Sequence, residues 1–188
     1  DFLQTLERKL HLVLDSISSN RGSAILWSDV DIIFLEDASP ILTRLLKHRK
    51  TDIWFQKEHP DKRDRTVNAG LVLMRCNDAV ERLYRDAMAI MKSTAGFHDQ
   101  DAINQLLRGG AGVNWGFLPP QFAARAHGWP PRRDIVAYHA NVTMGGDSVG
   151  QKIRQFRELD EIRRSSPESA NQNRLLARLG RHLLARQG

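Results

Sequence analysis

The feature that most constrains this chain is an apolar run over residues 24–35 with two carboxylates, Asp29 and Asp31, in its middle. Such a run is typical of a strand that is buried on both faces. An ionised carboxylate is costly to bury without a partner, and two neighbouring carboxylates repel each other. We therefore expect the pair to meet a positive group, or to lie where the strand opens into a cleft. A divalent cation that carries a diphosphate would satisfy both side chains, because hard cations prefer oxygen ligands.

A second interpretation of the same two residues is purely structural. A bare Asp-x-Asp also matches by accident, and in that case the two residues simply end a strand and cap the turn that follows it. The apolar flanks on both sides of the pair favour the cation-binding interpretation. Three further polar segments later in the chain also favour it.

Size and composition restrict the class of protein. The 188 residues suffice for one domain with a core of its own, and no stretch approaches the roughly 20 apolar residues of a membrane span. Cys76 is the single cysteine, so the chain has no internal disulfide and no cysteine-based zinc site. The net charge is +6, with many arginines in the last third, but no aromatic residues alternate with them. We therefore expect a solvated basic face and no nucleic-acid partner.

Helices and strands are predicted to alternate along the chain. We expect helices over residues 2–18, 37–47, 78–92, 99–107 and 151–164, and strands over residues 24–35, 52–55, 68–74, 113–118 and 135–139. Residues 123–134 and 144–150 are predicted to be loops. This alternation favours an α/β sheet with helices on both faces. Ligands bind such sheets beyond the carboxyl ends of the strands, which suits Asp29 and Asp31.

The second polar segment stands directly before an apolar strand and contains Asn68 and Gly70. A glycine there lets a ligand approach the backbone closely, and an amide both donates to and accepts from sugar hydroxyls. The alternative is an ordinary loop-to-strand turn. The third segment contains Asp99, Gln100 and Asp101 at a predicted helix start. These residues would hold sugar hydroxyls near the reacting carbon, or they would only cap the helix and favour its dipole.

The fourth segment contains His139 and Asn141 at a strand end, followed by a glycine-rich loop with Gly146 and then by Lys152. A lone histidine at such a place is more often structural than a ligand. Here a neutral imidazole would complete a metal site begun by the two aspartates. Lys152 and glycine amides of the loop would then reach the departing diphosphate.

Taken together, the four segments resemble the metal-dependent nucleotide-sugar glycosyltransferases of the GT-A type. The likeness is greatest to the nucleotide-diphospho-sugar transferase domain (the family-77-like group) and smaller to family-8 enzymes such as glycogenin. It covers about residues 5–160 and rests on Trp27-Ser28-Asp29-Val30-Asp31, Asn68-Ala69-Gly70, Asp99-Gln100-Asp101 with Asn104, and His139-Ala140-Asn141 with Gly146 and Lys152. In family-8 enzymes a Lys-Pro-Trp ending follows the histidine loop, whereas Ile153 follows Lys152 here.

The resemblance implies an α/β fold with a GT-A-like mixed, mostly parallel sheet flanked by helices. It implies a partial transferase domain over residues 1–164 and a basic helical tail over residues 165–188. In the family, the first nucleotide-binding strands precede the Asp-x-Asp strand. Because the chain opens at Asp1 without an initiator Met, we expect it to be a piece of a longer protein, incomplete at the N-terminus.

The resemblance also assigns roles to residues. Asp29, Asp31 and His139 would bind Mn²⁺ or Mg²⁺ together with the donor diphosphate, and Asp99 and Gln100 would be the catalytic residues. The implied substrate-binding residues are Ser28, Asn68, Gly70, Asp101, Asn141, Gly146 and Lys152. The donor would be a nucleotide-sugar, by resemblance a UDP-sugar, and the acceptor a hydroxyl of a glycan, a protein or a small molecule. Transfer would retain the anomeric configuration.

Two other functions stay open. The chain could be a non-catalytic module that binds a sugar-nucleotide or a partner protein. A haloacid-dehalogenase-type phosphatase also uses Asp-x-Asp after an apolar strand, but Ile33 stands where that class needs a small hydroxyl residue or Val, and no later acidic pair is evident. The compartment also stays open: a eukaryotic homologue would work in the Golgi lumen and a bacterial one in the cytoplasm.

Overall fold

The computed structural model describes residues 2–165, and the chain divides into two compact units between Asn141 and Val142. The helices of the first unit are α1 (Phe2–Ser19), α2 (Ser39–Leu46), α3 (Asp78–Ser93) and α4 (Asp99–Arg108), with a 3₁₀ turn at Arg125–His127. Its strands are β1 (Ala24–Ser28), β2 (Ile32–Phe34), β3 (Ile53–Lys57), β4 (Val67–Arg75), β5 (Trp115–Phe117), β6 (Phe122–Ala124) and β7 (Ala137–His139). The described part of the second unit contains α5 (Ser148–Ser165). No helix among the described residues is long and apolar enough to span a membrane.

The strands form two mixed sheets. The larger has the order β1-β4-β3-β5 and the smaller the order β2-β7-β6. β4 is the central long strand and runs antiparallel to both β1 and β3, while β5 runs parallel to β3. β7 pairs antiparallel with β2 and parallel with β6. The expected mixed α/β fold is confirmed, but antiparallel pairings outnumber parallel ones among the described strands, so the expected parallel majority is wrong.

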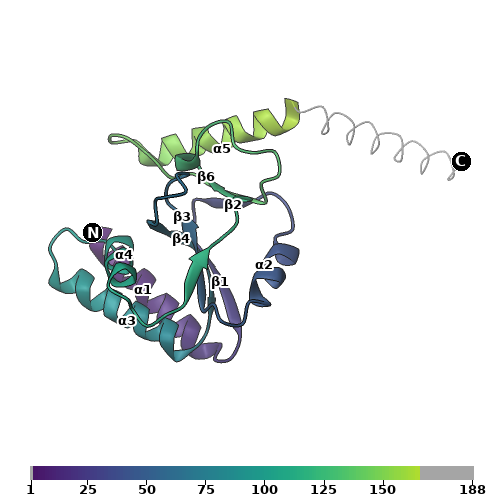
Figure 1. The fold of residues 1–188 in the computed structure, drawn as a ribbon. Coiled ribbons are helices and arrows are strands. Elements are labelled where there is room, and N and C mark those ends of the chain that lie inside the picture. The colour runs from purple at the N-terminus through teal and green to yellow at the C-terminus, as the bar shows by residue number, and fades with distance from the viewer. Residues whose placement is uncertain (1, 166–188) are drawn as a thin grey trace, which may run out of the picture. The chain divides into compact units, whose positions relative to one another are not determined.

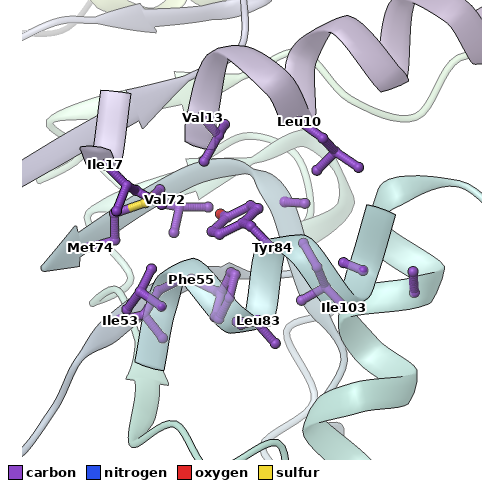
Figure 2. Packing of buried hydrophobic residues seen from close by; sticks show 14 of the residues in the cluster. Leu10, Val13, Ile17, Ile53, Phe55, Val72, Met74, Leu83, Tyr84 and Ile103 are labelled. Carbon is purple, nitrogen blue, oxygen red and sulfur yellow. The ribbon is translucent and has the colours of Figure 1, made fainter. Parts of the chain in front are cut away.

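One face of the larger sheet packs against three helices. Figure 1 shows α1, α3 and α4 together on this side, with α2 on the other side of the sheet. Alternate residues of β3 and β4, such as Phe55 and Val72, point into the cluster beneath these helices, and Leu10 of α1 packs against them. Figure 2 shows Tyr84 of α3 in the middle of this cluster. The opposite alternate residues, including Trp54 and Leu73, form a second cluster that α2 partly covers.

The expected helices of the first unit begin and end within two residues of the observed ones. Three expectations about strands and loops are wrong. The predicted loop over residues 144–150 ends inside α5, which begins at Ser148. The predicted loop over residues 123–134 begins inside β6, whose residues are buried and which pairs with β7. The run over residues 24–35 is not one strand but two, β1 and β2, which lie in different sheets. The expected basic tail lies outside the described residues, except for Ser165.

The break in that run falls at Asp29–Asp31. Val30 is fully exposed, and β1 is only half-buried rather than covered on both faces. A turn that carries two carboxylates is more stable when they keep some contact with water, because full burial in a strand would remove their hydration. The chain therefore leaves the larger sheet at Asp29 and enters the smaller one at Ile32.

Candidate functional site

The turn between β1 and β2 places the two aspartates near residues that are distant in sequence. The backbone N–H of Asp29 donates to the carbonyl of Gly70, at 2.8 Å. The carbonyl of Asp31 accepts from the N–H of Ala140, at 3.0 Å. One aspartate is thus fixed to β4 and the other to the end of β7. The predicted segments around Gly70 and His139 are brought together at this turn.

Asp31 and His139 face each other. Asp31 Oδ1 lies 3.4 Å from His139 Nε2, and both side chains are largely buried. On its other side, His139 Nδ1 lies 2.8 Å from Gln56 Oε1. The Gln56 amide nitrogen donates to the carbonyls of Phe122 and Ala123, which leaves Oε1 as its acceptor. This network therefore assigns the proton to Nδ1 and turns the lone pair of Nε2 toward a carboxylate.

Gly70 lies where Asp29 and His139 converge. A Cβ atom built on this glycine would stand 2.6 Å from His139 Cε1 and 3.2 Å from Asp29 Oδ2. It would also stand 2.9 Å from Asn68 Oδ1. Four predicted site residues therefore meet around one point on β4. The glycine keeps open the space that a side chain would fill, as its predicted role requires.

A partly buried cation, Lys9 of α1, lies at the other side of Asp29. Its Nζ is 3.0 Å from Asp29 Oδ2, 3.0 Å from Asp99 Oδ2 and 3.2 Å from the carbonyl of Ala69. The contact with Asp99 is ionic, because within the described residues that oxygen accepts no aligned hydrogen bond. Burial alone would lower the pKa of Lys9, but the charges of Asp99 and Asp29 outweigh it and raise that pKa above its ordinary value. The other oxygen of Asp29 accepts from Trp27 Nε1 at 3.2 Å.

Asn68 and Gln100 are joined by a carboxylate. Glu58 Oε2 accepts from Asn68 Nδ2 at 2.6 Å and from Gln100 Nε2 at 3.2 Å. The two amide oxygens bind backbone instead: Asn68 Oδ1 accepts from the N–H of Gly70, and Gln100 Oε1 from that of Ala69. The second and third predicted segments thus form one hydrogen-bonded unit at the start of β4.

Other predicted residues have structural partners. Asp101 Oδ2 accepts from the N–H of His98 at 3.1 Å, so the capping role that was left open applies to this residue. Asn104 is buried. Its Oδ1 accepts from the N–H of Val67 at 2.8 Å, and its Nδ2 donates to the carbonyl of Val67 at 2.9 Å. Ser28 Oγ donates to the carbonyl of Asp29, and Asn141 Oδ1 accepts from the N–H of Ala126.

Gly146 and Lys152 belong to the second unit, Val142–Gly188. Lys152 lies in α5, within the helix expected there. Their expected contacts with a diphosphate stay predictions, as do the assigned roles of all the predicted site residues.

Sequence reasoning missed four residues that contact the site: Lys9, Trp27 (as a ligand of Asp29), Gln56 and Glu58. A signal existed for Lys9, which stands three residues after Leu6 and four before Val13, on the apolar stripe of α1. A cation on such a stripe needs a buried anion. Gln56 directly follows the apolar residues of β3, but its partners Phe122, Ala123 and His139 lie far away in sequence.

Whether these side chains fit a metal ion depends on their donor atoms. Among residues 2–165, no three His, Cys, Asp or Glu side chains form a ready-made metal cluster. The facing of a ring nitrogen and a carboxylate oxygen at 3.4 Å nevertheless places two kinds of donor atom that divalent cations accept side by side. Asp31 and His139 therefore fit a cation, and Asp29 would join them by sharing its oxygens with Lys9.

Comparisons with known proteins give the family and the fold. Residues 1–156 match the sequence model of a family described as nucleotide-diphospho-sugar transferase. A solved structure of a glycosyltransferase involved in the glycosylation of the major capsid of PBCV-1 is similar, with a TM-score of 0.59. It is 13% identical, and the likeness covers 82% of this chain and 76% of that one. No curated protein matches the sequence.

Proposed function

Because the chain belongs to the nucleotide-diphospho-sugar transferase family and is a glycosyltransferase, we propose that it transfers a sugar from a UDP-sugar to a hydroxyl acceptor with the help of a divalent cation. Asp29, Asp31 and His139 would hold Mn²⁺ or Mg²⁺. The observation that supports this proposal most is the pairing of Asp31 with a histidine whose proton is fixed on the far nitrogen by Gln56. Such a histidine offers its lone pair to a cation.

The proposed cation would supply Lewis-acid stabilisation of the charge that develops on the departing diphosphate. The chain's own residues would bind and orient the donor. Asp29 is fixed by Trp27 and by its backbone bond to Gly70, so its carboxylate does not need to reorganise when the donor enters. The open face of Gly70 leaves room for the donor beside it.

The donor sugar would lie against Asn68 and Gln100. Both amides are held by Glu58 and by the β4 backbone, so their remaining polar groups have fixed directions. Fixed donors and acceptors orient sugar hydroxyls at little entropic cost. This arrangement supports their assignment to the sugar pocket.

Asp99 is a poor candidate for a nucleophile. Its side chain is buried, and its charge is compensated by Lys9 at 3.0 Å. A carboxylate paired in this way is less nucleophilic and cannot swing toward a sugar carbon without exposing Lys9. We therefore propose transfer with retention by front-face attack, in which the departing phosphate accepts the proton of the acceptor hydroxyl.

The test is UDP release from a panel of UDP-sugars, with and without Mn²⁺, in the native chain and in Asp31→Asn. We expect cation-dependent release for one donor of the panel and a loss of at least about tenfold in the variant. Asp86→Asn, which removes a carboxylate from the exposed face of α3, is the control and keeps full activity. Equal turnover by Asp31→Asn would contradict the proposal. NMR of the product's anomeric proton tests retention.

A further inference from the structure

Glu58 has one carboxylate oxygen fixed and one left open. Oε2 accepts from the amides of Asn68 and Gln100, at 2.6 and 3.2 Å. Across the described part of the chain, Oε1 receives no hydrogen bond, and no Lys, Arg or His lies within ion-pair distance of this carboxylate. The residue is half-buried rather than fully solvated. An ionised carboxylate that is held by two neutral amides accepts a hydrogen bond from a hydroxyl at its other oxygen, and it repels an anion.

Asn68 connects Glu58 to the aspartates. Asn68 joins the two, since its Nδ2 donates to Glu58 while its Oδ1 lies 2.9 Å from where a Cβ of Gly70 would stand. That point is also next to Asp29 and His139. A sugar attached to a diphosphate at the aspartates would therefore lie against the amides that Glu58 holds.

The charge balance of the site points the same way. Lys9 pairs with Asp29 and Asp99, and His139 faces Asp31, whereas the side-chain hydrogen bonds of Glu58 come from two neutral amides. A cation bound with a diphosphate would add little net positive charge, because the diphosphate carries its own negative charge. Among residues 2–165, Glu58 is therefore a carboxylate of this site whose side-chain partners are neutral.

We propose that Glu58 makes this site selective for neutral sugars. Its Oε1 would accept a hydrogen bond from a sugar hydroxyl, and its charge would repel a sugar that carries a carboxylate. The proposal rests on the proposed function, because it requires a nucleotide-sugar donor at the Asp29–Asp31 turn. It adds the class of sugar: hexoses or pentoses with hydroxyl substituents, not uronic acids. Glu58 is a specificity residue here and takes no part in bond making.

The test compares UDP-glucose with UDP-glucuronate, which differ only by a hydroxymethyl group against a carboxylate. Calorimetry with Mn²⁺ gives the affinity of each, with UDP itself as the reference ligand in every protein. In the native chain we expect UDP-glucuronate to bind at least about tenfold more weakly than UDP-glucose. In Glu58→Gln, which keeps an acceptor oxygen for the amides, the ratio falls to about threefold or less.

Asp86→Asn removes the same charge far from the site and is expected to keep the native ratio. Urea unfolding of Glu58→Gln checks that the variant is folded. Equal binding of the two UDP-sugars by the native chain would overturn this inference, and so would an affinity ratio that Glu58→Gln leaves unchanged. In either case, cation-dependent binding of UDP would still support the proposed function. Absence of cation-dependent UDP binding in the native chain would instead overturn the proposed function, and this inference with it.

Discussion

Lys9 Nζ lies 3.0 Å from Asp99 Oδ2, which joins the first helix of the chain to the N-terminus of α4. The same ammonium pairs with Asp29, so one partly buried cation compensates two carboxylates of the site. A buried pair of this kind does little for net stability, but removing one partner leaves uncompensated charge in the core. The ion pair therefore links the folding of the helical layer to the position of the Asp29–Asp31 turn.

The first prediction concerns this cation. Lys9→Met keeps the length of the side chain but removes its charge, and Asp29 and Asp99 then repel each other without the cation that they share. We expect the free energy of unfolding to fall by about 3 kcal/mol or more, measured by urea denaturation at pH 7.

Lys92→Met is the matched control for that variant. Lys92 pairs with Glu7, and both side chains are well exposed, so its loss is expected to cost less than about 1 kcal/mol. Equal losses for the two variants would mean that Lys9 is an ordinary surface lysine. Asp99→Asn combined with Lys9→Met should recover part of the stability, because it removes one of the unpaired charges.

The second prediction concerns Gly70. Gly70→Ala would place a methyl group 2.6 Å from His139 Cε1, so the ring must leave its present position. We expect cation-dependent UDP binding to fall at least about tenfold, as calorimetry would measure, because a misplaced ligand loses its geometry. Gly109→Ala is the control: its φ is −79° and the nearest atoms to a Cβ are 3.5 Å away, so binding should not change. An alanine tolerated at Gly70 would place the site elsewhere.

The third prediction concerns Tyr84 and alkaline pH. Burial raises the pKa of this phenol, and the nearby charges of Asp99 and Asp29 raise it further. The folded chain therefore keeps the proton, whereas the unfolded chain releases it near the ordinary pKa of about 10. Since the unfolded state binds fewer protons above that pH, stability is expected to fall as pH rises past about 10.

Absorbance at 295 nm checks this prediction, because the chain has only two tyrosines, and the other, Tyr138, is also buried. Phenolate absorbance should rise together with the loss of the far-UV circular dichroism signal. Tyr84→Phe should weaken the dependence of stability on pH in this range. A phenolate that forms in the folded chain near pH 10 would show that Tyr84 is open to solvent.

The sequence predicted the helices of the first unit well, because their apolar positions repeat at helical spacing. The family resemblance implied one pocket for Asn68, Gly70, Asp99 and Gln100, and their roles stay predictions. Hydrogen bonds join Asn68, Gly70 and Gln100 at the start of β4, and Lys9 connects Asp99 to the carbonyl of Ala69. Sequence reasoning failed where long-range packing decides. The aspartate run reads as one strand, and only the competition between two sheets breaks it at Val30.

The partners of the site residues could not be predicted for a similar reason. Gln56 reaches His139 beside a bulge between Phe55 and Gln56, and a bulge leaves no pattern in a short apolar strand. Glu58 stands in a charged stretch in which any carboxylate could be solvated. Its role follows from two amides that approach it from β4 and α4.

Calorimetric titration of the chain with UDP, in Mn²⁺ and again in excess EDTA, tests most directly whether the aspartate turn and His139 hold a cation and a diphosphate together. We expect binding in Mn²⁺ that EDTA weakens at least about tenfold, and that Asp31→Asn weakens to the same degree. UDP binding that neither EDTA nor Asp31→Asn changes would contradict this assignment.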